Sequence, residues 1–330
     1  MNTLTKTLMT ATLATALILT GCAPAPAAPE TPAPEAAAPA ETLNIGITQI
    51  VEHPSLDLIR QGVLDGLKDQ GFAEGSAITV DYANAQGNME NTQLIAQKFE
   101  SDKKDLVIAI TTPSGQAAKN NVKSCPVIFS AVTDPAGAGL VDKNITGVSD
   151  MTPITEQMEL LKALLPQART LGMVYNASEQ NSVVQVELTK EKAAALGLTV
   201  EAVAVTNANE IPLALDALLG KVDVLYTHVD NTLASAYGVI LQKAGEKQVP
   251  VLGAVEDYVK QGAIATRGID NYKVGYQTGL MAARVLKGED VNSIPFETLK
   301  ETDLILNTKA LAAFGITVPE ELKAQAKTVE

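Results

Sequence analysis

Apolar runs and helical patterns alternate along the chain from Leu43 onward. The run from Leu106 to Ile110 is apolar throughout, which is typical of a strand buried on both faces of a sheet. Between such runs apolar residues recur at helical spacing, as they do from Ser55 to Gln70. This alternation predicts βαβ units, parallel sheets and an α/β fold. The predicted strands are 43–48, 77–82, 106–110, 127–131, 170–175, 198–205, 222–227, 249–252, 263–266 and 303–306. The predicted helices are 55–70, 90–101, one beginning near 116, 151–165, 181–196, 211–219, 232–247 and 272–286.

The pattern occurs twice in the same order. D-L-V at 105–107 opens a strand that precedes the turn T-T-P-S, and D-V-L at 223–225 opens a strand that precedes the turn V-D-N-T. P-V-I at 126–128 and P-V-L at 250–252 open a second matching pair. The repeat predicts two domains of one topology. Because open α/β sheets bind ligands outside the carboxyl ends of their strands, we expect a site where strand ends of the two domains face each other.

The first 42 residues differ from the rest in composition. Lys6 precedes an apolar run at 8–20, which is too short for a stable membrane span and fits the apolar region of a signal peptide. The sequence L-T-G-C at 19–22 resembles the bacterial lipobox, which implies that residues 1–21 are removed and that Cys22 is acylated, for example with palmitate. Residues 22–42 are then a lipidated Cys and an Ala/Pro-rich tether. We expect a protein anchored by its lipid to the extracytoplasmic face of the cell membrane.

Charge and composition narrow the function. The net charge is −13 and the chain has no Trp, which argues against nucleic acid as a partner and against aromatic platforms for sugars or bases. Two histidines are too few for a convincing zinc site or catalytic triad, and T-P-S-G-Q around Ser114 lacks the first glycine of a nucleophile elbow. Cys125 is expected to pack in the core. We therefore expect a binding protein, not an enzyme, with neither cofactor nor metal.

Seven short motifs resemble one family in their order along the chain. They are E-H-P at 52–54, N-A-Q-G at 84–87, T-P-S-G-Q at 112–116, V-T-D-P at 132–135, T-G-V-S-D at 146–150, Y-N-A-S-E-Q-N-S at 175–182 and V-D-N-T at 229–232. Together they are similar to the substrate-binding lipoproteins of ABC importers, in the branch that binds tryptophan or other aromatic amino acids. The resemblance implies the type I periplasmic-binding-protein fold, in which two Rossmann-like lobes are joined by three crossings. It places 43–147 plus 255–300 in the N-terminal lobe and 148–254 plus 301–330 in the C-terminal lobe.

The resemblance implies a zwitterionic amino acid, with an apolar or aromatic side chain favoured, held between the lobes. Its carboxylate needs N–H and hydroxyl donors, which we expect from Thr112 as a helix N-cap, from Ser114 and from Ser130. Its ammonium needs a carboxylate, for which Asp230 beside Asn231 is the first choice, although Asp230 can also serve as a helix cap. The further candidates are Gln49, Asp134, Tyr175, Glu179, Asn181, Ser182 and Glu256. His53 is expected to act in packing or as part of a lid.

Two departures from the family concern the expected ligand. Ser114-Gly115 stands where relatives have small apolar residues, and Gly253-Ala254-Val255-Glu256 stands where they often have Asp or Ser. The identity of the amino acid therefore stays open at this stage, as do binding of a sugar or nucleoside and a role in ligand sensing. In the importer interpretation the partners are an ABC permease and its ATPase, and the protein is a monomer.

Overall fold

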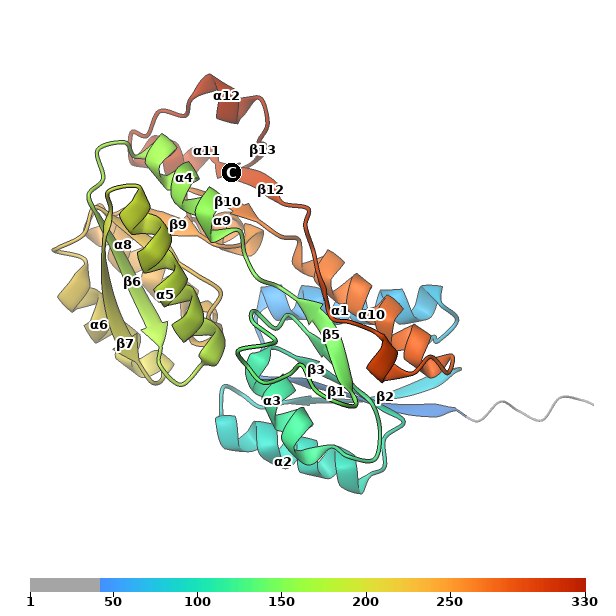
Figure 1. The fold of residues 1–330 in the computed structure, drawn as a ribbon. Helices are drawn as coiled ribbons and strands as arrows, with labels where there is room; N and C mark the ends of the chain where they lie inside the picture. Colours follow the sequence, from blue (N-terminus) through green and yellow to red (C-terminus); the bar gives the residue numbers. More distant parts are fainter. Residues whose placement is uncertain (1–41) are drawn as a thin grey trace, which may run out of the picture. The chain divides into compact units, whose positions relative to one another are not determined.

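The computed structural model describes residues 42–330. The predicted signal peptide, Cys22 and nearly all of the tether lie outside the described residues. Within 42–330 no helix combines the length and the apolar character needed to cross a membrane. These residues form two α/β lobes, each built around its own sheets (Figure 1).

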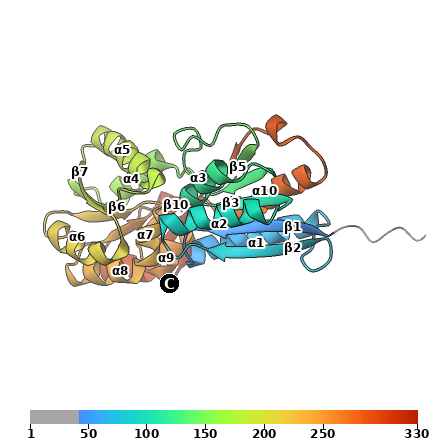
Figure 2. The same ribbon diagram turned by 90° about the horizontal axis from the view of Figure 1, so that it is seen from below.

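The first lobe contains a six-stranded sheet in the order β11-β5-β4-β3-β1-β2, in which every pairing is parallel. Its central strand β3 is buried at every position, as its uninterrupted apolar sequence predicts. Figure 2 shows β1 and β2 side by side at one edge. The strands are β1 (Leu43–Gln49), β2 (Ile78–Asn84), β3 (Leu106–Ile110), β4 (Val127–Ser130), β5 (Ile145–Ser149) and β11 (Glu297–Thr298).

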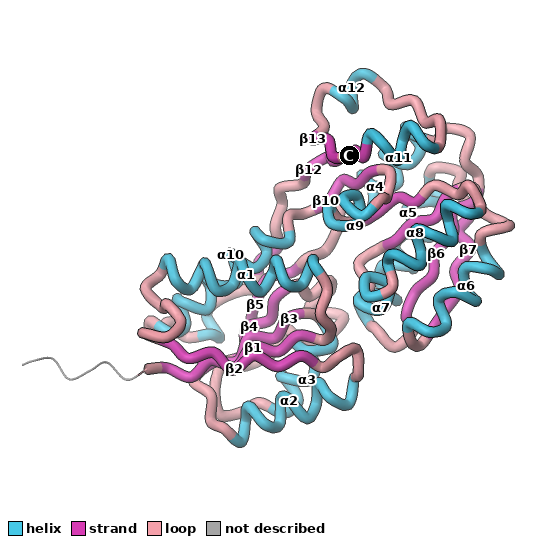
Figure 3. The backbone as a smooth tube through the Cα atoms, turned by 180° about the vertical axis from the view of Figure 1, so that it is seen from behind, coloured by secondary structure: helices cyan, strands magenta, loops and turns pink. Residues whose placement is uncertain are grey.

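Helices cover both faces of this sheet. Helices α1 (Pro54–Asp69) and α10 (Asn271–Leu286) pack on one face around Ile59 and Val274, and α2 (Met89–Ser101) and α3 (Thr112–Asn121) pack on the other around Phe99. Figures 1 and 3 show the two pairs on opposite sides of the strands. A short 3₁₀ helix, Val291–Ser293, precedes β11.

The second lobe contains a parallel sheet in the order β7-β6-β8-β9 and a smaller sheet in the order β10-β12-β13. Ile264 N donates to Val251 O at 2.8 Å, which brings the segment before β10 beside β9. The strands are β6 (Thr170–Asn176), β7 (Thr199–Val205), β8 (Val224–Thr227), β9 (Val251–Gly253), β10 (Ala265–Gly268), β12 (Asp303–Asn307) and β13 (Lys327–Val329). The α-helices are α4 (Ile154–Leu164), α5 (Gln180–Ala195), α6 (Ile211–Leu218), α7 (Asn231–Ser235), α8 (Tyr237–Glu246), α9 (Glu256–Gln261), α11 (Thr308–Ala313) and α12 (Glu320–Lys323), and a 3₁₀ helix covers Ala208–Glu210.

The chain passes between the lobes after β5, between β10 and α10, and between β11 and β12. The second passage lies later than the predicted boundary at 255. Val255, Tyr258 and Ile264 belong to the core of the second lobe, and β10 pairs antiparallel with β12. Residues 255–268 therefore lie in the second lobe, and the return to the first lobe begins only at α10.

Several local features differ from the predicted elements. Strands β5, β11 and β13 and helices α9, α11 and α12 were not predicted. The predicted helix 232–247 is interrupted at Ala236 and forms α7 and α8 instead. The interruption follows from Tyr237, whose ring stacks on Tyr258 with centroids 4.1 Å apart and whose hydroxyl lies 3.0 Å from Thr227 Oγ1. These contacts fix the start of α8 independently of α7.

Glycines bring α1 and α10 unusually close. A Cβ atom at Gly275 would lie 1.9 Å from Ile59 O, and one at Gly279 would lie 2.3 Å from Val63 O. On α1, a Cβ atom at Gly62 would lie 2.3 Å from Tyr272 O. The absence of side chains at these positions allows the two backbones to touch. The helix that returns from the second lobe is thereby tied to the first helix of the chain.

Candidate functional site

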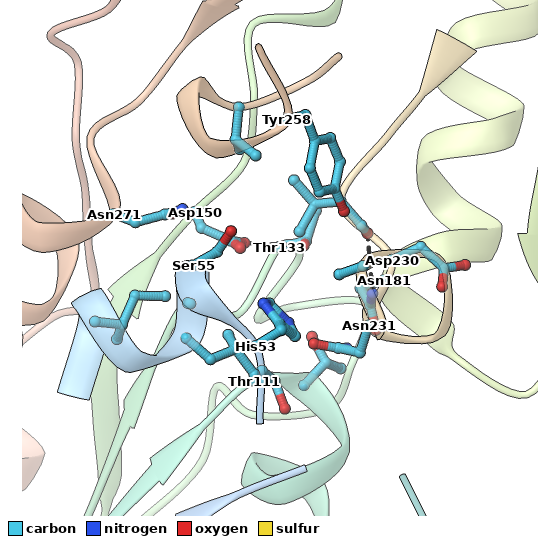
Figure 4. Close-up of a pocket in the computed structure, with 17 residues that line it drawn as sticks. His53, Ser55, Thr111, Thr133, Asp150, Asn181, Asp230, Asn231, Tyr258 and Asn271 are labelled. Carbon is cyan, nitrogen blue, oxygen red and sulfur yellow. Dashed lines mark hydrogen bonds between the residues drawn. The ribbon is translucent and has the colours of Figure 1, made fainter. Parts of the chain in front are cut away.

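A pocket is lined by residues of both lobes that follow the carboxyl ends of parallel strands (Figure 4). Parallel strands end at the same edge of a sheet, so the loops after β1, β3, β4 and β5 meet those after β6 and β8. Its lining residues on the first-lobe side are His53, Ser55, Leu56, Ile59, Thr111, Thr112, Ala131, Thr133, Asp150 and Asn271. On the second-lobe side they are Asn181, Val229, Asp230, Asn231, Ala234, Val255 and Tyr258.

The first-lobe wall, defined here as Ser55, Thr111, Thr112, Ala131 and Thr133, contains two residues with a strained backbone. Thr111 has φ 85° and Ala131 has φ 54°, in the left-handed region that non-glycine residues seldom occupy. Both residues follow neighbouring strands and both line the pocket. Strained residues of this kind tend to occur at functional sites.

The same wall presents polar groups at the start of α3. The helix begins at Thr112, so Thr111 stands at the N-cap position that was predicted for Thr112, and its side chain makes no cap hydrogen bond. The hydroxyls of Thr111 and Thr112 are buried without a hydrogen-bond partner among the described residues. Because buried hydroxyls are normally paired, these two are available to a ligand, at the positive end of the helix dipole.

Asp150 is a buried carboxylate on the first-lobe side, directly after β5. It is 4% exposed, and Thr133 Oγ1 donates to its Oδ1 at 2.9 Å. Removal of the carboxyl from water raises the pKa of Asp150 to about 6. Among the described residues no cationic side chain pairs with it, so this carboxylate can accept hydrogen bonds from a bound cation.

Asp230, on the second-lobe side, has most of its hydrogen-bonding capacity occupied. Its Oδ1 accepts from Leu233 N at 2.9 Å and so caps α7. Its Oδ2 accepts from Asn176 N at 2.7 Å and from Ser182 Oγ at 2.5 Å. Burial raises the pKa of Asp230, while these donors act in the opposite direction. The cap that the sequence allowed as an alternative role is present.

Ser182, His228 and Asp230 adjoin one another but do not form a catalytic triad. Ser182 Oγ lies 2.7 Å from His228 Nε2 and donates to Asp230, so the imidazole Nε2–H is the donor to Ser182. His228 Nδ1, which a triad aspartate would contact, has no hydrogen-bond partner among the described residues. Burial lowers the pKa of His228 to about 4, which keeps the ring neutral. The group holds β8 and α5 together.

His53 and Tyr258 add neutral polar groups to the pocket. Burial lowers the pKa of His53 to about 4, an effect that Asp57 and Asp257 only partly offset. The imidazole is therefore neutral at pH 7, and its Nε2 has no hydrogen-bond partner among the described residues. Burial raises the pKa of Tyr258 far above its usual value, so its hydroxyl stays protonated. Figure 4 shows the His53 ring between Asp150 and Asn231 and the Tyr258 ring directed toward the side of Asp230.

Twelve residues were predicted to bind the ligand, and the structure brings four of them to the pocket: Thr112, Asn181, Asp230 and Asn231. Glu179 and Ser182 lie directly behind this lining, hydrogen-bonded to Asn231 and Asp230 respectively.

The other six predicted residues do not line the pocket. Gln49 Nε2 donates to Val51 O at 2.8 Å, Ser130 Oγ contacts Thr278 Oγ1 of α10 at 2.8 Å, and Ser114 is fully buried in α3. Each points into the first lobe. The other three contact neighbouring residues instead of the pocket. Asp134 accepts from Gly137 N, Glu256 pairs with Lys260, and Tyr175 packs against the core of the second lobe.

Several lining residues were not among the predicted site residues. Asp150 and Thr133 belong to motifs that were recognised, T-G-V-S-D and V-T-D-P, and a strand assigned to 145–149 would have drawn attention to Asp150. Tyr258 lies in α9, which was not predicted, and Asn271 is the first residue of α10, which was predicted to begin one residue later. Thr111 is one residue before the predicted cap. Within residues 42–330, no cluster of three His, Cys, Asp or Glu side chains is arranged to hold a metal ion.

Comparison with known proteins agrees with this geometry. A family model described as ABC transporter substrate binding protein matches residues 44–330. A tyrosine-binding protein of Clostridioides difficile (strain R20291) is 43% identical over 279 residues, which cover 83% of this chain and 81% of that protein.

Two solved structures are informative. An ABC domain from Streptococcus pneumonia in complex with L-Trp has a TM-score of 0.85 and 36% identity, covering 88% of this chain and 100% of that one. The ligand-free, open structure of a substrate binding protein with adhesive properties from Clostridium difficile has a TM-score of 0.66 and 43% identity, covering 88% and 99%. The described residues thus resemble the L-Trp complex more than the open structure, although sequence identity favours the latter. The match over nearly all of the described residues shows that the chain belongs to the family of ABC transporter substrate binding proteins.

Proposed function

We propose that this protein captures a free amino acid with an apolar or aromatic side chain and presents it to an ABC importer. The observation that carries the proposal is the buried carboxylate of Asp150 in a pocket that also contains two hydroxyls without partners, at Thr111 and Thr112. A zwitterion supplies both of the groups that these residues lack. The relatives described as binding tyrosine and L-Trp support the same class of ligand.

The hydrogen-bond acceptors and donors of the pocket determine where each charged group of the ligand binds. The ammonium group binds Asp150, because an ionised carboxylate forms strong hydrogen bonds with N–H donors. The carboxylate group binds Thr111 and Thr112 at the N-terminus of α3, where hydroxyls and the helix dipole favour an anion. The side chain lies along Leu56, Ile59, Val255 and the ring of Tyr258.

Asp230 then stabilises the second lobe instead of supplying the main contact to the ammonium. Its two oxygens already accept from Leu233 N, Asn176 N and Ser182 Oγ. Asp150 accepts from one side chain, Thr133. A carboxylate with free capacity is the better acceptor for a new donor.

The wider role follows from the family and from the first 42 residues. The acyl chains on Cys22 hold the protein at the extracytoplasmic face of the membrane, and the tether gives the lobes reach toward a permease. Contacts of the ligand with both lobes stabilise their closed arrangement, which docks on the permease and delivers the ligand while an ATPase drives transport. The protein acts in this way as a monomer.

Calorimetric titration with the twenty amino acids tests the ligand, and three variants test the site. Asp150→Asn is expected to weaken binding of the best amino acid about 100-fold, and Asp230→Asn by less, with loss of stability as its main effect. Asp142→Asn, an exposed carboxylate of the first lobe, is the control and should bind as the wild type does. Absence of binding by any amino acid at millimolar concentration would refute the ligand class. Wild-type affinity in Asp150→Asn would refute its role.

A further inference from the structure

Glu179 lies behind the second-lobe wall, defined here as Asn181, Asp230 and Asn231. It precedes α5 but makes no cap hydrogen bond to that helix. Its carboxylate instead accepts from the first turn of α7: Asn231 N at 3.1 Å, Thr232 N at 3.1 Å and Thr232 Oγ1 at 2.8 Å. One side chain from the loop after β6 therefore anchors the segment that follows β8.

The same carboxylate receives the amide groups of two residues that line the pocket. Asn231 Nδ2 donates to Glu179 Oε2 at 2.6 Å, and Asn181 Nδ2 donates to the same oxygen at 3.3 Å. A carboxylate can only accept, so these contacts assign the NH₂ group of each amide to the side of Glu179 and the oxygen to the opposite side. Asn181 Oδ1 has no hydrogen-bond partner among the described residues. Figure 4 shows Asn231 directed toward His53 and the centre of the pocket.

The hydrogen-bond donors around Glu179 suit its ionised form. The side chain is 1% exposed, and Asn176 Nδ2 donates to Oε1 at 3.3 Å in addition to the groups above. Burial and the nearby charge of Asp230 raise the pKa of Glu179, and the hydrogen bonds from Asn231 and Thr232, which favour the ionised form, only partly offset this. All of its contacts are donors, which a protonated carboxyl would satisfy less well.

We propose that Glu179 is a positioning residue that makes the second-lobe wall accept, and not donate, hydrogen bonds. It holds the NH₂ group of Asn231 and, together with Val229 O, that of Asn181, so that Asn181 Oδ1 is left for the ligand and the amide oxygen of Asn231 faces His53. An ammonium carries three donors and can bind Asp150 and an amide oxygen of the opposite wall together. The inference rests on the amino-acid-binding function proposed above and adds the group that selects amines over analogues that lack the amine.

The test compares L-tyrosine with 3-(4-hydroxyphenyl)propionate, which has the same side chain and carboxylate but no amine. Glu179→Gln keeps the shape of the side chain but has one acceptor oxygen in place of two, so the donors that Glu179 holds compete for it and the two asparagine amides are held less firmly. The ratio measured is the dissociation constant of the amine-free compound divided by that of L-tyrosine. In Glu179→Gln this ratio is expected to fall about tenfold, the size of one hydrogen bond to a charged group. A purely structural role would weaken both compounds equally and leave the ratio unchanged, which would overturn the proposal. Glu159→Gln, exposed on α4, is the matched control.

A second variant and a ligand-free measurement complete the test. Asn181→Ala removes one acceptor without changing Glu179 and should also lower the ratio, which decides the matter if Glu179→Gln does not fold. In the free wild type, the Nδ2 protons of Asn231 should exchange slowly with solvent by NMR, and in Glu179→Gln they should exchange faster. Equal exchange in the two proteins would overturn the proposed orientation, and this test needs no ligand. Failure of the wild type to bind any amino acid would instead refute the proposed function.

Discussion

The two walls of the pocket differ in how far the protein satisfies its own polar groups. On the first-lobe wall, the hydroxyls of Thr111 and Thr112 have no hydrogen-bond partner among the described residues, and Thr111 and Ala131 are strained. On the second-lobe wall, Asp230 is bonded through both oxygens, and the NH₂ groups of Asn181 and Asn231 are bonded to Glu179. One wall is incomplete without a ligand, while the other is already organised.

The two walls are therefore expected to respond differently to a ligand. Groups whose partners are fixed in advance lose little freedom when a ligand arrives, so the second-lobe wall is preorganised. Groups without partners gain hydrogen bonds only in the complex, so the first-lobe wall responds most to ligand. Substitutions on the first-lobe wall should therefore change affinity more than stability, and substitutions behind the second-lobe wall should change stability most.

The largest effect is expected from Glu179→Ala. It leaves the N–H groups of Asn231 and Thr232 and the side-chain amide of Asn231 buried without their acceptor, whereas Asn181 Nδ2 keeps Val229 O. Buried donors left without an acceptor cost about 1 to 3 kcal/mol each, and relief of the repulsion from Asp230 offsets part of this, so the free energy of unfolding should fall by about 3 kcal/mol. Urea unfolding measures this loss, with Glu159→Ala on the exposed face of α4 as the control. A loss below 1 kcal/mol would show that the second-lobe wall is not organised by Glu179.

The next effect is a pH-dependent gain of stability in Asp150→Asn. The pKa of this carboxyl rises from 3.8 to about 6 in the fold, so the folded wild type loses stability as pH rises from about 4 through about 6. At 1.36 kcal/mol per pKa unit, the variant should be up to about 3 kcal/mol more stable than the wild type above pH 6. The difference should vanish near pH 4. Thermal unfolding of the ligand-free proteins between pH 4 and pH 8 tests this, and a difference independent of pH would contradict it.

The same titration predicts how affinity depends on pH. Protonation of Asp150 removes the acceptor for the ammonium, so the affinity of the wild type should fall about tenfold between pH 7 and pH 5 if the pKa is near 6. Titration calorimetry at several pH values measures this. In Asp150→Asn the dependence should disappear in this range. A wild-type affinity that is flat from pH 7 to pH 5 would place the ammonium elsewhere.

Thr111→Gly is expected to stabilise the protein while weakening binding. Glycine adopts φ 85° without strain, which relieves about 1 to 3 kcal/mol, and part of this gain is lost because glycine is more flexible in the unfolded chain. The net gain should be about 1 kcal/mol. Thr227→Gly, at the end of β8 in the second lobe where φ is not positive, should instead destabilise. If both variants lose stability, the strain on the first-lobe wall is not significant.

The smallest change in stability is expected from Thr112→Val. The Thr112 hydroxyl has no partner among the described residues, so the free energy of unfolding should change by less than about 0.5 kcal/mol, while ligand affinity falls several-fold. Thr133→Val is the matched control, because it removes a hydrogen bond to the buried Asp150 and should destabilise more. Equal loss of stability in both variants would contradict the interpretation that the Thr133 hydroxyl stabilises the fold and the Thr112 hydroxyl does not.

Much of the fold was predictable because burial leaves clear patterns. The run at 106–110 is a strand buried on both faces, and the helical spacing from 55 to 70 corresponds to α1 within one residue at each end. Strand β5, I-T-G-V-S, was missed because it is short and contains three small or polar residues. The position of the second passage between the lobes was not predictable from pattern, since the segment 255–268 fits either sheet locally and long-range pairing with β12 decides it.

The site was only partly predictable for a related reason. Charge and turn position indicated Asp230, but a sequence does not show that Ser182 and Asn176, distant along the chain, already occupy its oxygens. Asp150 was overlooked because β5 was not recognised, and a residue's place at a strand end is visible only when the strand is. Glu179 was predicted to touch the ligand, whereas the structure places it behind the asparagines. The turn residues in the sequence thus indicated where the pocket lies, and the hydrogen bonds in the structure showed which residues line it and which support the lining.

The close contact of α1 with α10 has a consequence for the order in which the chain folds. Tyr272 and Tyr276 donate to Asp65 and Asp69 across a sequence separation of 207 residues, and glycines bring the two backbones together at the same place. One face of the first sheet is therefore covered fully only after the second-lobe segment from α4 to β10 has been synthesised. Contacts so distant in sequence slow folding. The first lobe should remain an incomplete, chaperone-accessible intermediate until residues 271–286 emerge, and an alanine at Gly275 should prolong that stage.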